Sequence, residues 1–202
     1  MDHIQEQQPL PQFIQKICET VARCPVNMTE QDMFDCLSIK RRFPLIIRSH
    51  NFPHHNHDWE VPSLEIITQW GKITHEIFDA HFYLIFDEWK KYYDLGFTTI
   101  ISHALDLTSE LRQLDKELTK ITGKPNYGNL YFSKGSSDHV VSFPHHNHDY
   151  DVVVKPIYGK YTWKIGDEFI ENEDGIIYLP TGTYHSVVDV PGPKLSLTLN
   201  LM

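Results

Sequence analysis

Two short histidine-containing segments restrict the fold of this chain more than any other feature of its 202 residues. The first, residues 143–151 (FPHHNHDYD), runs directly into three consecutive valines, which favour a strand. Successive side chains on a strand point to opposite faces, so His146 and His148 would share one face and could bind one metal ion. The second, residues 179–185 (LPTGTYH), supplies a third imidazole after a proline–glycine turn. We therefore predict that His146, His148 and His185 form a metal site.

The first 126 residues are predicted to be mainly helical. Apolar residues at helical spacing predict helices over residues 11–23 and 107–121, and a glycine just beyond the second is typical of a C-terminal cap. Thr29 and Asp32 have the spacing of a capping pair for a short helix that continues to about Ile39. These segments therefore indicate a helical N-terminal part.

The next stretch mixes helical and strand patterns. Residues 63–93 have a helical pattern, and the aromatic stripe from Phe82 to Tyr93 is interpreted as core or as a homodimer interface. Strands are predicted at residues 42–48 and 97–101 because apolar, β-branched residues dominate both.

From residue 127 onward the pattern is that of β-structure. Six short strands are predicted, at residues 127–133, 152–157, 161–165, 175–179, 185–190 and 195–201. We therefore expect a mainly β fold, in which residues 127–202 form a jelly-roll barrel. Residues 1–126 would be an integral part of this fold and would add strands to a sheet edge.

Another histidine cluster lies about 90 residues before residues 143–149. Residues 52–58 (FPHHNHD) repeat residues 143–149 residue for residue. The chain after residue 58 has neither a strand–turn–strand pattern nor a second proline–glycine–histidine turn, and two copies are too few for a repeat architecture. We therefore interpret residues 52–58 as a surface loop, in preference to a second metal or substrate site.

Composition excludes some classes of partner. The net charge of -9 argues against a nucleic-acid backbone as a partner, but it is compatible with a basic protein or peptide substrate. The three cysteines lack CxxC spacing, which favours a reduced, cytoplasmic setting. Since no apolar run approaches membrane-spanning length, we expect no membrane association.

Four segments, in the right order, resemble the JmjC-type cupin oxygenases, closest to the branch of ribosomal-protein hydroxylases. They are residues 94–98 (DLGFT), residues 128–133 (GNLYFS), residues 143–163 from FPHH to the tryptophan, and residues 178–199 from YLPTGTYH to LSLTL. The resemblance implies a cupin barrel in which Fe(II) and 2-oxoglutarate activate O2 to hydroxylate a protein side chain. It therefore implies an oxidoreductase of the dioxygenase class.

The chain departs from this family at one metal ligand. The family uses HxD…H, a facial triad of two histidines and one carboxylate. Here His148 stands at the position of the aspartate. Asp149 would point to the opposite face of a regular strand, although a β-bulge could redirect it. Asp151 is interpreted as a hydrogen-bonding support for a ligand or a turn.

A second departure concerns the co-substrate. The family places a lysine two residues after a strand-ending glycine, where it binds the distal carboxylate of 2-oxoglutarate. Tyr161 occupies that position here and offers an uncharged hydroxyl, so weaker binding is expected. Lys155 is a candidate substitute, Asn129 matches an asparagine of the family, and Thr198 faces the barrel on one phase of strand alternation.

Three functions remain open at this stage. The first is an Fe(II)- and 2-oxoglutarate-dependent hydroxylase that acts on a protein or a small metabolite, with Fe(II) replaceable by another divalent metal. The second is a three-histidine cupin dioxygenase that does not use 2-oxoglutarate. The third is a non-catalytic, metal-binding cupin.

Overall fold

The computed structural model describes residues 10–39, 63–67, 77–81, 83–135, 143–172 and 175–201. The strand predicted at residues 42–48 and the histidine cluster at residues 52–58 lie outside these ranges. The helices in chain order are α1 (Gln12–Arg23), α2 (Glu30–Ser38), α3 (Phe86–Asp94), the 3-10 turn η1 (Ala104–Asp106) and α4 (Ser109–Thr122). The strands are β1 (Ser63–Ile67), β2 (Thr98–Ser102), β3 (Tyr127–Ser133), β4 (Asp151–Tyr158), β5 (Thr162–Ile165), β6 (Glu168–Glu171), β7 (Ile177–Leu179), β8 (His185–Asp189) and β9 (Lys194–Leu201).

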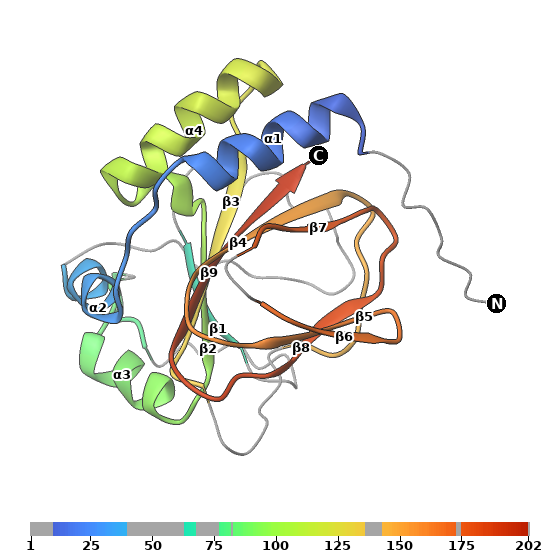
Figure 1. Ribbon diagram of the computed structural model, residues 1–202. Helices are drawn as coiled ribbons and strands as arrows, with labels where there is room; N and C mark the ends of the chain where they lie inside the picture. Colours follow the sequence, from blue (N-terminus) through green and yellow to red (C-terminus); the bar gives the residue numbers. More distant parts are fainter. Residues whose placement is uncertain are drawn as a thin grey trace.

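The strands form two antiparallel sheets. The larger has six strands in the order β1-β2-β3-β9-β4-β7, and the smaller has three in the order β6-β5-β8. Figure 1 shows the smaller sheet facing one side of the larger sheet. The helices lie on the other side of the larger sheet. This double-sheet arrangement is the cupin type of jelly roll, so the predicted fold class is confirmed.

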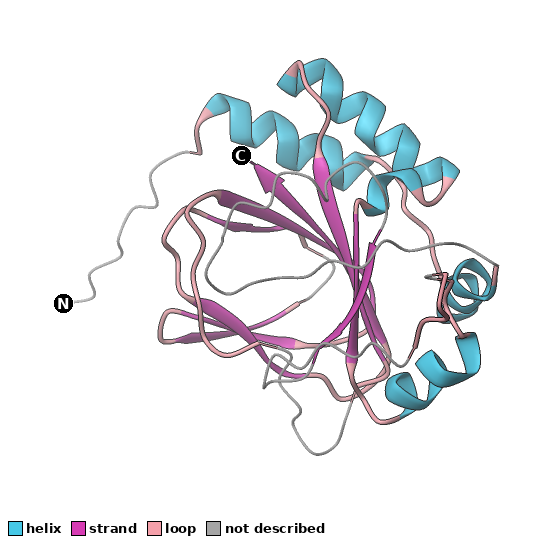
Figure 2. Ribbon diagram, turned by 180° about the vertical axis from the view of Figure 1, so that it is seen from behind, coloured by secondary structure: helices cyan, strands magenta, loops and turns pink. Residues whose placement is uncertain are grey.

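Strand β9 explains why the larger sheet needs cover on both faces. Its Leu195, Leu197 and Leu199 are at most 1% exposed and pack into the main core together with side chains of all four α-helices. Helices α1 and α4 are in contact and lie across this face, as Figure 2 shows from behind. The residues between these leucines point into the space between the two sheets.

Several predicted elements are confirmed with their capping chemistry. Helix α2 begins with a capping box in which Thr29 and Asp32 exchange side-chain and backbone hydrogen bonds. Helix α4 ends at Gly123, whose φ of 71° is the left-handed conformation that favours glycine. The six strands predicted from residue 127 onward are all present as β3, β4, β5, β7, β8 and β9.

The helix predicted over residues 63–93 is wrong in its first part. Residues Ser63–Ile67 form strand β1, and the helix α3 begins only at Phe86. Strand β1 pairs along its whole length with β2, from Ser63 opposite Ser102 to Ile67 opposite Thr98. A short apolar run fits either structure, and here the backbone hydrogen bonds offered by the edge of β2 decide it. Strands β1 and β2 lie at one edge of the larger sheet.

We predict that residues 125–202 do not fold alone. Without the N-terminal part, Leu130, Leu197 and Leu199 would be exposed to water, and a buried leucine is worth about 1.5–3 kcal/mol. Urea titration of this fragment, followed by circular dichroism, should give no cooperative transition. A cooperative transition of this fragment would show that the helical part is dispensable for folding.

Candidate metal centre

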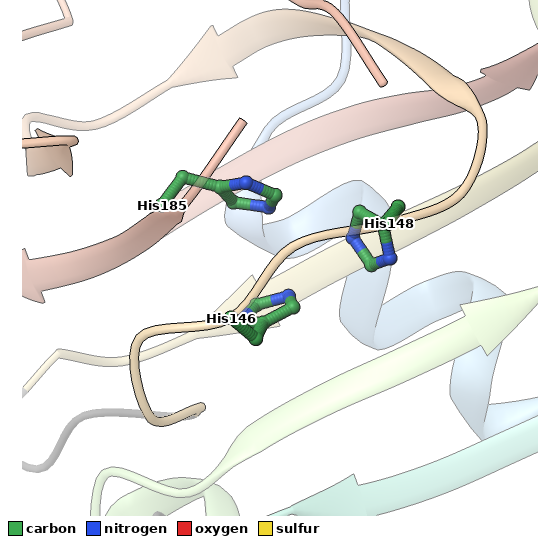
Figure 3. A group of neighbouring side chains, drawn as sticks. All are labelled: His146, His148 and His185. Atoms are coloured by element: carbon green, nitrogen blue, oxygen red, sulfur yellow. The ribbon is translucent and has the colours of Figure 1, made fainter. Parts of the chain in front are cut away.

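Three histidines meet at one end of the space between the sheets. One ring nitrogen each of His146, His148 and His185 lies within 4.8 Å of the others. Their ring centroids are 4.5 to 5.1 Å apart. Figure 3 shows the three rings turned toward a common point. The structure thus brings together the three residues that the sequence singled out.

The path of the chain differs from the expected one. His146 and His148 lie in the loop before β4, so they do not share the face of a regular strand. Instead, His146 forms an isolated β-bridge with His185, with N–H···O distances of 3.0 and 2.7 Å. The backbone N–H of Gly182 donates to the carbonyl of His148 at 2.8 Å. Backbone hydrogen bonds therefore fix all three histidines relative to one another.

Hydrogen bonds also orient two of the imidazole rings. Nδ1 of His146 lies 2.8 Å from the carbonyl oxygen of Pro144, and Nδ1 of His185 lies 2.8 Å from that of Thr183. A carbonyl can only accept, so each Nδ1 carries the proton and each Nε2 keeps a free lone pair. This is the usual way in which a protein prepares a histidine as a metal ligand.

The electrostatic environment keeps the imidazoles of His148 and His185 neutral. Burial, together with the nearby His146 and His185, lowers the pKa of His148 to about 4. Burial also lowers the pKa of His185, against the effect of its hydrogen bond to Thr183. Only the neutral imidazole binds a metal, so no proton has to leave these two rings at neutral pH.

Asp151 supports the turn that carries His185. Its carboxylate accepts hydrogen bonds from the backbone N–H and the hydroxyl of Thr181, both at 2.8 Å, and from the hydroxyl of Tyr178 at 2.9 Å. Burial alone would raise the pKa of Asp151, but these hydrogen bonds outweigh it and lower the pKa below its ordinary value. The predicted supporting role of Asp151 is therefore observed at the turn.

The other residues predicted around the site are dispersed. Asp149 is exposed and is not one of the three converging groups, so no bulge redirects it. Lys155 is on the helix-covered face of β4, where its Nζ donates to the carbonyl of Val21 in α1 at 2.7 Å, so it is no substitute for the missing lysine. Asn129 and Thr198 are paired across β3 and β9. Tyr161 is 1% exposed and packs between the two sheets.

One group of residues was only partly predicted from the sequence, which placed Thr198 toward the barrel interior but not Lys194 or Ser133. The inner face of β9 and its neighbour β3 is polar and buried, with Lys194 opposite Ser133 and Ser196 opposite Tyr131. The signal was the alternation KLSLTLNL, in which every second residue from Lys194 to Asn200 is polar. A strand that is buried on both faces and polar on one lines a binding space more readily than it fills a core.

Comparison with solved structures supports the fold. The ribosomal oxygenase YcfD from Escherichia coli, solved with cobalt and succinic acid, matches 87% of this chain with a TM-score of 0.53 and 16% identity. The dimethylsulfoniopropionate (DMSP) lyase DddQ from Ruegeria pomeroyi matches 40% with a TM-score of 0.34 and 15% identity. A cupin superfamily protein from Desulfitobacterium hafniense matches 38% with a TM-score of 0.32 and 15% identity.

These similarities are partial. The matches span 44% of the Escherichia coli chain, 42% of the Ruegeria chain and 67% of the Desulfitobacterium chain. No family model matches the sequence, and no curated protein matches it. The Escherichia coli structure, whose TM-score is above 0.5, supports the same overall fold for this chain. Among the described helices, none is long and apolar enough to cross a membrane.

We predict that Asp151→Asn lowers the free energy of unfolding by about 1–3 kcal/mol, because an amide replaces a charged acceptor of three hydrogen bonds. The carboxylate has a depressed pKa in the folded state, so its contribution is complete above about pH 4, the ordinary carboxylate value. It is lost as the pH falls through the folded-state pKa. Urea unfolding at pH 7 and pH 3 should therefore show a larger difference from wild type at pH 7 than at pH 3.

The exposed Asp149 provides the matched control for this measurement. Asp149→Asn should change the free energy of unfolding by less than about 0.5 kcal/mol at either pH. Equal effects of the two substitutions at pH 7 would contradict the role assigned to Asp151.

Proposed function

We propose that this protein is an oxygenase of the JmjC-like cupin type, which binds Fe(II) at His146, His148 and His185 and uses 2-oxoglutarate and O2 to hydroxylate a protein side chain or a small metabolite. The convergence of the three imidazoles within 4.8 Å is the observation that carries the proposal. The fold shared with the Escherichia coli ribosomal oxygenase over 87% of this chain supports it.

The donor set fits a divalent transition metal. Imidazole nitrogens suit iron, and two of the three rings have their Nδ1 proton engaged by a carbonyl oxygen. Three protein ligands leave coordination positions of the metal open. Bound iron would activate O2 there together with a 2-oxo acid. Imidazole suits several divalent metals, and the family resemblance is the reason for proposing Fe(II) among them.

The residues of the chain then have distinct tasks. His146 and His185 are held by their mutual backbone bridge, and Asp151 fixes the turn before His185. Trp163 lies against His185 with a centroid distance of 5.9 Å and is 7% exposed, so it keeps water from that side of the site. Exclusion of water protects an oxidising reaction from side reactions.

One observation favours a second candidate, a three-histidine dioxygenase that does not use 2-oxoglutarate. His148 occupies the place of the carboxylate ligand, and Asp149 stays exposed outside the group. Three neutral ligands leave the charge of the metal uncompensated by the protein, which changes the reactivity of the metal. The two candidates differ in whether a 2-oxo acid is consumed.

We predict that His148→Ala weakens the affinity for Fe(II) by more than the roughly 10–100-fold typical for loss of an outer partner of a ligand, because it removes a ligand itself, and that iron content falls as a result. Elemental analysis of protein loaded with Fe(II) without oxygen measures this. His145→Ala is the matched control, since His145 is exposed and lies in the same loop outside the triad. Equal iron loss in both variants, or in neither, would refute the assignment.

We also predict that the iron-loaded protein, supplied with ascorbate as the two-electron reductant, converts 2-oxoglutarate to succinate and CO2 only when O2 is present, even without the substrate that it would hydroxylate. His185→Ala should lose this turnover together with its iron. Oxygen consumption that is independent of 2-oxoglutarate would instead identify the three-histidine dioxygenase. An iron-loaded protein that consumes no oxygen under either condition, or with candidate substrates, would be a non-catalytic cupin.

A further inference from the structure

One strand of the smaller sheet has an open edge. Strand β6 pairs with β5 on one side, and among the described residues no strand pairs with its other side (Figure 1). All four residues of β6 are exposed, and its apolar side chains, Phe169 and Ile170, are 68% and 40% exposed. An exposed apolar edge strand is a template for pairing with another chain. This edge is therefore a candidate docking site for an extended chain.

The backbone of β6 directs alternate polar groups toward this open edge. Asn172, which follows β6, donates its N–H to the carbonyl of Tyr161 at 3.0 Å. In an antiparallel pair only every second residue exchanges hydrogen bonds with its neighbour. The even-numbered residues of β6 therefore bond to β5, whereas the N–H and C=O groups of Phe169 and Glu171 point to the open edge. A further strand can pair with these groups.

The two apolar side chains of β6 lie on opposite faces of the sheet. Ile170 is opposite Trp163, whose ring packs between the two sheets, so Ile170 lies on the inner face. Phe169 is opposite Lys164 on the outer face, where the Lys164 Nζ lies 6.0 Å from the centroid of the Phe169 ring. A strand added to this edge would thus find an apolar contact on each face.

The charges around the edge favour one kind of partner. The carboxylates of Asp167, Glu168 and Glu171 are exposed, and none of them forms a salt bridge with another described residue. Lys164 is on β5, one strand away from the edge. A second copy of this chain, whose net charge is -9, would bring two such sets of carboxylates together, which is unfavourable. Lysine or arginine side chains of a basic peptide would instead pair with them.

The edge also lies near the candidate metal centre. Glu168 is opposite Ile165, which in turn is opposite His185 on β8. Residues directly opposite one another share a face of the sheet, so Glu168 is on the same face as His185. Neighbouring strands are about 4.8 Å apart, which places the backbone of β6 roughly 10 Å from that of His185. A peptide paired with β6 would therefore lie within a few residues' length of the three-histidine group.

We propose that the open edge of β6 binds an extended, basic segment of a protein substrate as an additional strand. Backbone hydrogen bonds to Phe169 and Glu171 provide affinity, and the carboxylates of Glu168 and Glu171 select lysine or arginine. The inference rests on the proposed function for the role of the bound chain as a substrate. It deepens that function, because it assigns a protein and not a metabolite, and because it places docking outside the reaction site.

A short peptide tests the charge preference. The probe is the acetylated and amidated hexapeptide Gly-Lys-Val-Ile-Lys-Gly, in which two lysines flank two apolar residues as Glu168 and Glu171 flank those of β6. Calorimetry would measure its binding to the full-length protein. The matched peptide Gly-Glu-Val-Ile-Glu-Gly should bind at least about tenfold more weakly, since two favourable charge pairs become two repulsive ones. Equal affinities for the two peptides would contradict the proposal.

Alternate N-methylation of the probe tests strand pairing itself. One analogue is methylated on the N–H of the first lysine and the isoleucine, and the other on the N–H of the valine and the second lysine. Only one edge of an added strand faces β6. One analogue should therefore lose binding by at least about tenfold, and the other should keep it. Equal loss in both analogues, or in neither, would refute strand addition.

A charge-reversed protein separates recognition from folding. Glu168→Lys combined with Glu171→Lys should weaken binding of the lysine peptide by at least about tenfold and strengthen binding of the glutamate peptide by a similar factor. A reversed preference of this kind cannot arise from damage to the fold. The control is Glu19→Lys combined with Asp35→Lys, which makes the same change in net charge at exposed positions of α1 and α2. The control should keep the wild-type preference, and equal effects of the two double variants would refute the docking edge.

The outcomes distinguish this edge from the proposed function. Absence of lysine-peptide binding, with turnover of 2-oxoglutarate retained, refutes the docking edge and leaves the proposed function standing. Strand-type binding by a protein that lacks turnover supports the docking edge and refutes the oxygenase reaction. A wild-type dimer in sedimentation that Phe169→Thr dissociates would show that a second copy of the chain occupies the edge, and would refute peptide docking.

Discussion

The alternation of side chains along β9 is the constraint on which the rest of this structure depends. Leu195, Leu197 and Leu199 form one face and must be covered, so the larger sheet requires the helices of the N-terminal part. The opposite face carries Lys194 and Ser196, which an apolar filling would leave unsatisfied. One strand therefore specifies both the helical cover on one face of the larger sheet and buried polar side chains on the other face.

Backbone contacts also position the residues of the candidate metal centre. The bridge between His146 and His185 joins the loop before β4 to the first residue of β8, so the two sheets are linked at the point where the rings converge. Asp151, at the start of β4, holds the turn before β8 through Thr181. Positioning of the histidines is thus part of the folding of the sheets, which makes the site rigid before any ligand binds.

Much of the fold and of the candidate site was predictable from the sequence, because residue type and local spacing determine those parts. The cap at Gly123 follows from spacing and residue type. The three histidines converge as predicted, but through a loop and a backbone bridge to His185 and not through the face of a regular strand. Strand β6 was missed, although Gly166 begins a two-residue hairpin turn before this strand. The four residues of β6 are all exposed, so they lack an apolar–polar alternation in burial. Pairing with the distant strand β2 also determines that residues Ser63–Ile67 form a strand. No local sequence pattern reports which sheet edge is free to pair.

Lys194 was not predictable for a different reason. A lysine in a sequence is ordinarily a solvated side chain, and only the register of β9 against β3, with Lys194 opposite Ser133, shows that it faces inward. Burial lowers the pKa of Lys194 to about 8, and its Nζ lies 4.5 Å from the centroid of the Tyr161 ring. The register of a strand against its neighbours sets a position of this kind, and no local sequence pattern reports that register.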